Sequence, residues 1–360
     1  MTRARAMRSL ACALLALVLA AGALAGCSSA GETSAEADAD ATEEAAGSED
    51  GSADEAADDD SVDDTDADAT EDAAATAVTF TDDLGREVTV TSTERVVACM
   101  GSFADAWQNA GGTLVGASDD AFEHYDVDAD TVAGVGRSTD LSLESILALE
   151  PDFVIMTATT SSKHSTGVSQ SELEEALTEA GIAVAFFSVS TLEDYERMMG
   201  IFCQITGRDD LYESEVEALQ AEVDAIIAES TASESQPTVV VLSASSKGLT
   251  IQDSSTLTGS MLADLGCVNV TDLYPSLLDD FSLEALLEID PDYVFVLAAS
   301  DDAETAQRYY DEAVGLSDAW AELTAVQEGR VTVLDTAHFL YKPNALWAES
   351  YQILADALAQ

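Results

Sequence analysis

Two segments of the chain carry the same pattern, and this repeat constrains the fold more than any other feature. Residues 140–156 read Asp-Leu-Ser-Leu-Glu-Ser-Ile-Leu-Ala-Leu-Glu-Pro-Asp-Phe-Val-Ile-Met, and residues 280–296 read Asp-Phe-Ser-Leu-Glu-Ala-Leu-Leu-Glu-Ile-Asp-Pro-Asp-Tyr-Val-Phe-Val. Each copy has a serine that can cap an amphipathic helix, then a Pro-Asp break, then an apolar run typical of a buried strand. A chain with two such units is expected to form two similar lobes.

Strand-like and helix-like segments alternate along the rest of the chain. A β-hairpin is predicted at 78–90, a helix at 103–110, and the longest helical pattern at 208–230. Short apolar strands are predicted at 95–100, 114–117, 153–158, 183–189, 239–244, 268–270, 293–298 and 331–334. This alternation is typical of α/β layers with mostly parallel sheets. We expect an α/β fold of two Rossmann-like lobes, at 79–207 and 231–360, joined by one long α-helix at 208–230.

The start of the chain has the order of parts found in a lipoprotein signal. Arg3, Arg5 and Arg8 form a basic head, residues 9–26 are almost wholly apolar or small, and Leu24-Ala25-Gly26-Cys27 has the form of a lipobox. The sequence therefore predicts a signal peptide at 1–26 and a lipid on Cys27. An uncleaved anchor with a chance cysteine is the alternative. Several lipid chains hold a protein durably, so we expect it on the extracytoplasmic face of the cell membrane.

The segment that follows Cys27 is acidic and has no apolar periodicity. Residues 28–78 contain 19 Asp or Glu and no Lys or Arg. Such a segment has no core to offset the entropy of ordering it, so 27–78 is predicted to be a lipidated cysteine and a disordered spacer. Residues 79–360 hold 51 acidic and 10 basic residues. That balance argues against nucleic acid or anionic lipid as a partner.

Cysteine, histidine and catalytic patterns exclude several classes of protein. Cys99, Cys203 and Cys267 lie apart in apolar surroundings, which indicates buried thiols and leaves one disulfide open. The three histidines are scattered, so a transition-metal site is not expected. No Gly-x-Ser-x-Gly elbow, His-Glu-x-x-His helix or P-loop is present. The chain is therefore not expected to be an enzyme.

At three places the sequence resembles a known family. Residues 81–88, Thr-Asp-Asp-Leu-Gly-Arg-Glu-Val, followed by Arg95-Val96-Val97, are similar to the opening of the iron-siderophore, haem and cobalamin class of ABC-transporter substrate-binding proteins. The repeat, and residues 341–351, Tyr-Lys-Pro-Asn-Ala-Leu-Trp-Ala-Glu-Ser-Tyr, are similar to the same class. The resemblance implies a ligand groove between two lobes joined by a long helix.

The same resemblance implies the function and the partners. The chain would be a monomer that captures a small-molecule chelate and delivers it to an ABC permease dimer with a cytoplasmic ATPase. It would have no cofactor of its own, although the ligand would carry Fe³⁺ or a corrinoid. An iron-siderophore is the first expectation, cobalamin the second and haem the third. The alternative is a ligand-binding surface lipoprotein that feeds a sensor or surface assembly.

Glu144 and Glu284 occupy equivalent positions in the two repeat copies. The resemblance implies that one acidic residue on each lobe meets arginines of the two permease subunits. Two separated negative contacts would fix the orientation of a two-fold partner and speed encounter. The alternative is a local role, because a Glu in the first turn of a helix is favoured by the helix dipole.

The candidate ligand contacts follow strands or Gly-rich turns, since ligands in open α/β sheets lie off the carboxyl ends of strands. Arg137 follows Gly134-Val135-Gly136 and offers a planar fork of donors to an anionic oxygen, unless it forms a surface ion pair. The other candidates are Met100, Ser102, Phe103, Lys163, His164, Lys247, Tyr341 and Lys342. Core packing is the alternative for the aromatic residues, and an ordinary exposed loop is the alternative for Lys163 and His164.

Overall fold

The computed structural model describes residues 77–158, 170–230, 236–279, 281–315 and 318–360. Within the chain, Glu71–Gln360 form one compact unit. The predicted signal peptide, the lipid site Cys27, nearly all of the spacer, and the candidates Lys163 and His164 lie outside the described residues. The predicted division at 207 and 231 into lobes and a linker is not tested by this grouping, and it stays a prediction.

The first lobe is built on a five-stranded parallel sheet in the order β5-β4-β3-β8-β9. Its strands are β3 (Val96–Ala98), β4 (Gly116–Ala117), β5 (Ala133–Gly134), β8 (Phe153–Thr157) and β9 (Ala183–Phe187). A small antiparallel pair, β6 (Gly136–Arg137) and β7 (Asp140–Leu141), stands beside it. The helices are α1 (Gly101–Asn109), α2 (Asp120–His124), α3 (Leu143–Ala148), α4 (Gln170–Glu179) and α5 (Leu192–Thr206).

Alternating side chains explain why helices cover both faces of this sheet. Val96 and Ala98 of β3 enter one buried cluster, while Val97 enters another. On β8, Phe153 and Ile155 join the first cluster, and the residues between them join the second. A parallel strand buried on both faces reads as a continuous apolar run, which is the pattern that made these strands predictable.

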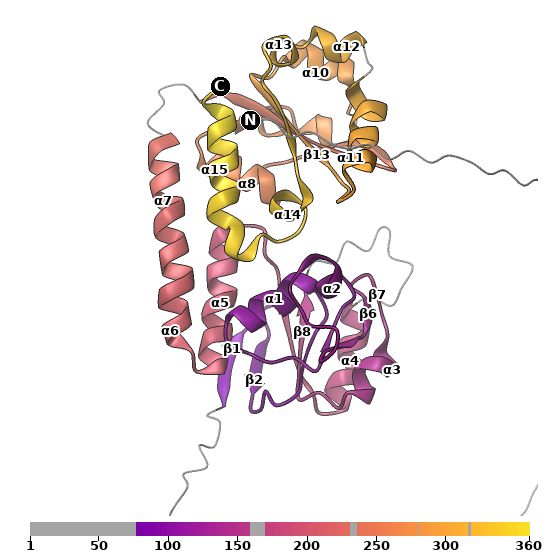
Figure 1. The fold of residues 1–360 in the computed structure, drawn as a ribbon, viewed down its shortest axis with the longest axis vertical. Helices are drawn as coiled ribbons and strands as arrows, with labels where there is room; N and C mark the ends of the chain where they lie inside the picture. Colours follow the sequence, from indigo (N-terminus) through magenta and orange to yellow (C-terminus); the bar gives the residue numbers. More distant parts are fainter. Residues whose placement is uncertain (1–76, 159–169, 231–235, 280, 316–317) are drawn as a thin grey trace, which may run out of the picture. The chain divides into compact units, whose positions relative to one another are not determined.

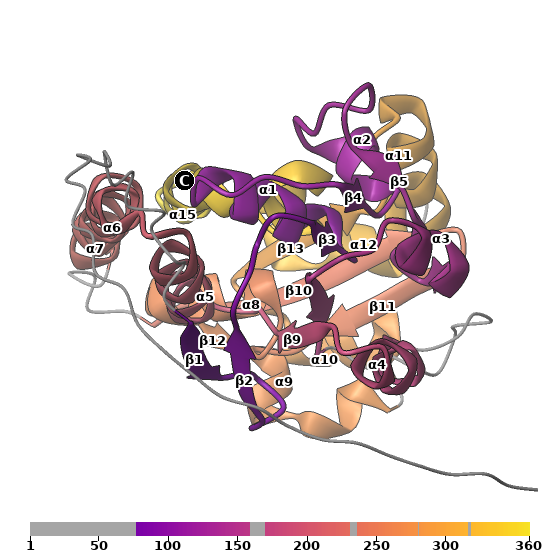
Figure 2. The ribbon, with the colours of Figure 1, turned by 90° about the horizontal axis from the view of Figure 1, so that it is seen from below.

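The second lobe has a mixed sheet. Its path is β11-β10-β13-β14, and β12 pairs in parallel with the start of β10. The strands are β10 (Thr238–Ser245), β11 (Gly248–Gln252), β12 (Val268–Asn269), β13 (Tyr293–Ala298) and β14 (Val331–Leu334). Among the described strands of this sheet, β11 alone is antiparallel, and it lies beside β10 as the second arm of a hairpin (Figure 2). The remaining pairs of this sheet and all pairs of the first five-stranded sheet are parallel, so the predicted α/β class with mostly parallel sheets is confirmed.

Short helices surround this sheet. They are α8 (Leu257–Asp264), α9 (Val270–Leu273), η2 (Pro275–Leu278), α10 (Leu283–Ile289), α11 (Ala303–Tyr310), η3 (Asp311–Gly315), α12 (Asp318–Glu322), α13 (Thr324–Gln327), α14 (Thr336–Phe339) and η4 (Asn344–Leu346). The strand predicted at 268–270 ends one residue early. Asn269 caps α9 by accepting a hydrogen bond from the backbone N–H of Thr271, so Val270 begins a helix.

A continuous helical run joins the two lobes, as predicted. It consists of α6 (Asp209–Leu211), the π-helical η1 (Tyr212–Glu217) and α7 (Ala218–Ser230). The run lies beside α5, and α7 lies beside the last helix, α15 (Trp347–Leu358) (Figure 1). The Tyr212 ring is so close to Gly200 of α5 that a Cβ at Gly200 would lie 3.3 Å from it. The long helix is therefore packed along its length and is not a free linker.

The two repeat copies have the same local structure. Ser142 and Ser282 cap α3 and α10, each accepting a hydrogen bond from a backbone N–H three residues on. The Asp of each Pro-Asp pair accepts from the backbone at the start of a sheet strand of its own lobe: Asp152 from Glu94, two residues before β3, at 2.9 Å, and Asp292 from Thr238, the first residue of β10, at 2.8 Å. The repeat is thus one structural unit used twice.

One hydrophobic cluster extends through both lobes. It contains Phe103 and Trp107 of α1, Val241 of β10, Phe295 of β13 and Trp347 of α15, all at most 1% exposed. Burying large aromatic side chains is worth about 1.5–3 kcal/mol each. The two lobes therefore share a core, and any movement between them must preserve it.

The amino-terminal hairpin is held to the first lobe by one buried carboxylate. β1 (Val78–Thr81) and β2 (Glu87–Val90) pair antiparallel, and Asp82 lies at their turn. The Asp82 side chain, which has no exposed surface, accepts hydrogen bonds from Nε of Arg86 at 3.0 Å and from the backbone N–H of Phe186 in β9 at 3.1 Å. The Asp-Leu-Gly-Arg motif is therefore a clamp between hairpin and sheet.

Asp82→Asn should lower the free energy of unfolding at pH 7 by about 1–3 kcal/mol, because it removes the charged acceptor of hydrogen bonds from Arg86, which keeps only Glu174 as an ion-pair partner among the described residues. Burial opposes ionisation of Asp82, but hydrogen bonds from Arg86 and Phe186 hold its pKa below the ordinary 3.8. The stabilisation is therefore present above pH 3.8 and is lost as the pH falls through the lowered pKa. Urea unfolding should show a smaller difference in stability between the variant and the unaltered protein at pH 3 than at pH 7. Glu87→Gln, an exposed change in the same hairpin, should have little effect.

Candidate ligand-binding groove

Residues that follow the carboxyl ends of both sheets meet between the lobes. From the first lobe come Ser102 and Asp105 of α1, after β3, and Tyr125, after β4 and α2. From the second lobe come Asp301, after β13, and the segment 341–346, after β14 and α14. Ligands of α/β sheets bind at these ends of strands, so this contact zone is the candidate site.

Two hydrogen-bonded contacts cross the zone. The hydroxyl of Tyr125 donates to the carbonyl oxygen of Lys342 at 3.1 Å. The amide Nδ2 of Asn344 donates to the carbonyl oxygen of Ser102 at 2.9 Å and to the carboxylate of Asp105 at 2.7 Å. Asn344 is 2% exposed and has a φ of 47°, a left-handed conformation that Asn tolerates better than most residues.

A third contact is a histidine–carboxylate pair beside a ring stack. Nδ1 of His124 lies 3.0 Å from Oδ2 of Asp301, and the His124 ring stacks on Tyr341 with 4.0 Å between centroids. The Tyr341 hydroxyl donates to Asp301 at 3.2 Å, and Thr336 donates to the other oxygen of the same carboxylate. Burial and the Asp301 charge raise the pKa of Tyr341 to about 12, so the phenol is a neutral donor at physiological pH.

These contacts surround a cleft of about 290 Å³. Its wall includes Asp105, Asn109, His124, Tyr125, Tyr341 and Lys342. Burial raises the pKa of Asp105, although its amide donors oppose the change. The volume is at the lower end of the range for small-molecule sites, about 300–1,000 Å³. In this conformation the cleft has room for one arm of a larger ligand.

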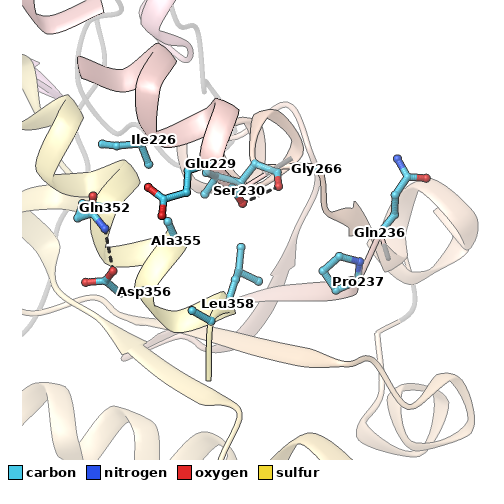
Figure 3. Close-up of a pocket in the computed structure, with 12 residues that line it drawn as sticks. Ile226, Glu229, Ser230, Gln236, Pro237, Gly266, Gln352, Ala355, Asp356 and Leu358 are labelled. Carbon is cyan, nitrogen blue, oxygen red and sulfur yellow. Dashed lines mark hydrogen bonds between the residues drawn. The ribbon is translucent and has the colours of Figure 1, made fainter. Parts of the chain in front are cut away.

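A larger cavity, of about 500 Å³, lies at the other end of the second sheet (Figure 3). It is lined by the end of α7, by α15 and by Gln236 and Pro237, which precede β10. Two of its polar side chains are already hydrogen-bonded, since Gln352 donates to Asp356 at 2.7 Å and Ser230 donates to the carbonyl of Leu265 at 3.0 Å. It lies at the amino end of β10, so we assign the ligand site to the smaller cleft.

A family model described as periplasmic binding protein matches residues 96–337. The chain belongs to this family. The predicted resemblance is thereby confirmed, and membership of a family of binding proteins means that the chain is not an enzyme. A comparison of the sequence with curated proteins gave no match.

Solved periplasmic binding proteins share the fold. IsdE from S. aureus, crystallised with haem, is 15% identical with a TM-score of 0.60, covering 74% of this chain and 99% of its own. SirA from Staphylococcus aureus, in complex with staphyloferrin B, is 20% identical with a TM-score of 0.58, covering 78% and 97%. The catecholate-siderophore binding protein VctP from Vibrio cholerae is 16% identical with a TM-score of 0.59, covering 79% and 100%. At these identities the likeness establishes the two-lobed fold.

Some of the described Lys and Arg side chains of this periplasmic binding protein form ion pairs, and others do not. Five described arginines form ion pairs with carboxylates: Arg86, Arg197, Arg208, Arg308 and Arg330. Arg95 donates to the carbonyls of Leu149 and Glu150 at the end of α3. Arg137, Lys247 and Lys342 form no ion pair with any residue in the described ranges. These are the three described cations that the sequence singled out as ligand contacts.

The structure brings some predicted site residues to the cleft and leaves others away from it. Tyr341 and Lys342 line it, and the backbone of Ser102 borders it through Asn344. Phe103 is 1% exposed and packs edge-on against Phe187, so it belongs to the core. Met100 is partly buried against the same core. Arg137 is exposed on β6.

Three more predicted residues lie on the surface. Lys247 is exposed in the turn between β10 and β11. Glu144 and Glu284 are exposed in the first turns of α3 and α10. None of these three touches the cleft, which is consistent with the separate docking role predicted for the two glutamates but does not test it.

The sequence reasoning missed Asp105, His124, Tyr125 and Asp301. Asp301 lies three residues after the end of the predicted strand 293–298, so the rule that selected Tyr341 would also have selected it. Asp105 and Tyr125 gave no such signal, because their role depends on which turns of α1 and α2 face the second lobe.

The described ranges also bear on metal binding and on membrane insertion. No three His, Cys, Asp or Glu side chains there converge on a possible metal position. No helix in the same part of the chain has the length and apolar character to cross a bilayer. Cys99, Cys203 and Cys267 are buried free thiols, and burial raises the pKa of Cys99 and Cys267 to about 12.

Lys342→Met should raise the free energy of unfolding at pH 7 by about 0.5–2 kcal/mol, the usual gain from removing an unfavourable group. Burial lowers the pKa of the Lys342 ammonium from 10.5, with Asp194 opposing only in part. The folded state therefore binds this proton less well than the unfolded chain, and the penalty fades as pH rises toward 10.5. Urea unfolding should show a smaller difference in stability between Lys342→Met and the unaltered protein at pH 10 than at pH 7. The exposed Lys247→Met change should leave stability unaltered.

Proposed function

We propose that this periplasmic binding protein is the extracytoplasmic substrate-binding component of an ABC importer for an iron-siderophore-like or cobalamin-like ligand. The observation that carries the proposal is the meeting of both sets of carboxyl-end loops around one cleft. Family membership supports it. The haem, staphyloferrin and catecholate binders of the same fold supply the ligand classes to test.

The size of the cleft has a consequence for how the ligand binds. A whole chelate needs more than about 290 Å³, so binding separates some of the contacts made by His124, Tyr125 and Asn344. Because the two lobes share a core on the helical side, the lobes can separate only on the side where these polar contacts lie. We propose that Arg137, Lys247, Tyr341 and Lys342 contact the chelate once the groove has opened, together with Met100 and Ser102 at the turn after β3. Phe103, also predicted from the sequence, stays in the shared core.

Arg137→Ala should weaken binding of an anionic ferric siderophore by about 1–3 kcal/mol, the scale of a charge-assisted hydrogen bond. Arg137 is exposed and has no carboxylate partner in the described ranges, so its charge is available to a ligand. Isothermal titration of purified protein gives the dissociation constant. Arg308→Ala, which removes an exposed arginine of α11, is the matched control. An unchanged dissociation constant for the Arg137 variant removes that residue from the site.

Glu144 and Glu284 are proposed as the permease contacts. They occupy the same position on the two equivalent helices, are exposed, and form no ion pair with a described residue. Their negative charges suit a partner that offers one cationic patch on each of two subunits. The same positions also favour the helix dipoles, so only a functional assay separates the two roles.

The double variant Glu144→Gln/Glu284→Gln should keep the dissociation constant of the ligand and lose most transport. The measurement is ligand-stimulated ATP hydrolysis by the reconstituted permease and ATPase. Glu179→Gln/Glu288→Gln, two exposed glutamates of α4 and α10, removes the same charge elsewhere. If both double variants stimulate equally, the docking assignment fails. If no permease responds even to the unaltered protein, the surface sensor becomes the better interpretation.

A further inference from the structure

The cleft combines aromatic walls with a carboxylate that has no cationic partner. His124, Tyr125 and Tyr341 contribute rings, and Asp105 contributes the carboxylate. Oδ2 of Asp105 accepts hydrogen bonds from the amides of Asn344 at 2.7 Å and Asn109 at 3.1 Å. No described Lys, Arg or His pairs with it. A partly buried carboxylate held only by neutral amides keeps its negative charge available to a bound group.

The electrostatic surroundings of Asp105 are also acidic. The charge of Asp126 adds to burial in raising the pKa of Asp105, and Asp105 in turn helps to raise the pKa of Tyr125. Asp120 and Asp301 act in the same direction on Tyr341. A cation placed in this cleft would relieve these repulsions, whereas an anion would add to them.

Lys342 also borders the cleft, but it forms no ion pair with Asp105. Its carbonyl oxygen accepts the Tyr125 hydroxyl, and the nearby charge that acts on its ammonium is that of Asp194, at the start of α5. Among the described residues that line the cleft, the Asp105 carboxylate therefore has no cationic partner.

Aromatic faces and a single carboxylate are the usual receptor for an organic ammonium. The phenol rings of Tyr125 and Tyr341 attract a cation through their quadrupoles, and the carboxylate accepts charge-assisted hydrogen bonds from the N–H groups of the ammonium. A bare divalent metal fits poorly, since it requires several oxygen ligands and the described cleft offers one carboxylate.

We infer that this cleft binds a protonated amine arm of the ligand, so that the transported chelate carries a free ammonium group. The inference rests on the proposed function and makes Asp105 a specificity-determining residue within it. Arg137 and the other groove cations remain available to the oxygen shell of the same chelate, so the two sets of contacts do not compete.

Three forms of one linear ferric trihydroxamate test the inference. They share the chelate and differ at the terminal amine, which is free and positive, acetylated and neutral, or succinylated and negative. The unaltered protein should bind the free amine at least about tenfold more tightly than the acetylated form, the scale of one charge-assisted hydrogen bond. The succinylated form should bind least well. Isothermal titration at fixed pH and salt gives all three constants.

Three variants test whether the preference for the free amine arises in the cleft. Asp105→Asn keeps the shape and the acceptor for Asn344, and should bring the free amine down to the affinity of the acetylated form. Asp126→Asn removes a nearby exposed charge that does not line the cleft, and should keep most of the preference. Tyr341→Leu removes one ring without changing Asp105. It should reduce the preference for the free amine, and it provides a test if Asp105→Asn is unstable.

Each other outcome is decisive. Equal binding of the three forms, or binding of haem or a corrinoid but of none of the three, overturns the amine site and leaves the proposed function standing. Tightest binding of the succinylated form, lost in Lys342→Met, would make the cleft an anion site instead. Failure of every class of chelate to bind would remove the proposed function as well.

Discussion

The hydrophobic cluster shared by the two lobes is the constraint on which the rest of the structure depends. Side chains from α1, β10, β13 and α15 meet in it, and the helical run through α7 packs along the same side. Two separate cores would let the lobes turn freely about a linker. One common core holds them together on the helical side and confines movement to the side where His124, Tyr125 and Asn344 make polar contacts.

Most of the fold was predictable because each element had a local cause. The buried parallel strands were continuous apolar runs, and the capping residues Ser142 and Ser282 indicated where their helices begin. The antiparallel arm β11 was missed, because Gly248–Gln252 has mixed burial and lacks a strong apolar pattern. The end of β12 was misplaced by one residue, since the capping by Asn269 overrode the strand preference of Val270.

The candidate site was less predictable, because it depends on contacts between residues far apart in the chain. Tyr341 was found from its place after a strand, yet its partner His124 lies more than two hundred residues earlier. The aromatic residue Phe103 has the right position for a groove contact, but its orientation on α1 directs it into the core. The sequence indicates where a residue lies along a strand or helix. Which residue of the other lobe its side chain contacts depends on the tertiary structure.

The Asp82 clamp has a mechanical consequence. A pull applied at the amino end of β1 would enter the first lobe at Val78 and not at the groove. Such a force would first part the Val78–Val90 pair and would then unzip the hairpin toward its turn, where Asp82 ties Arg86 to β9. Such a pull would thus act on the hairpin and on the rim of one sheet before it reached the residues that line the cleft.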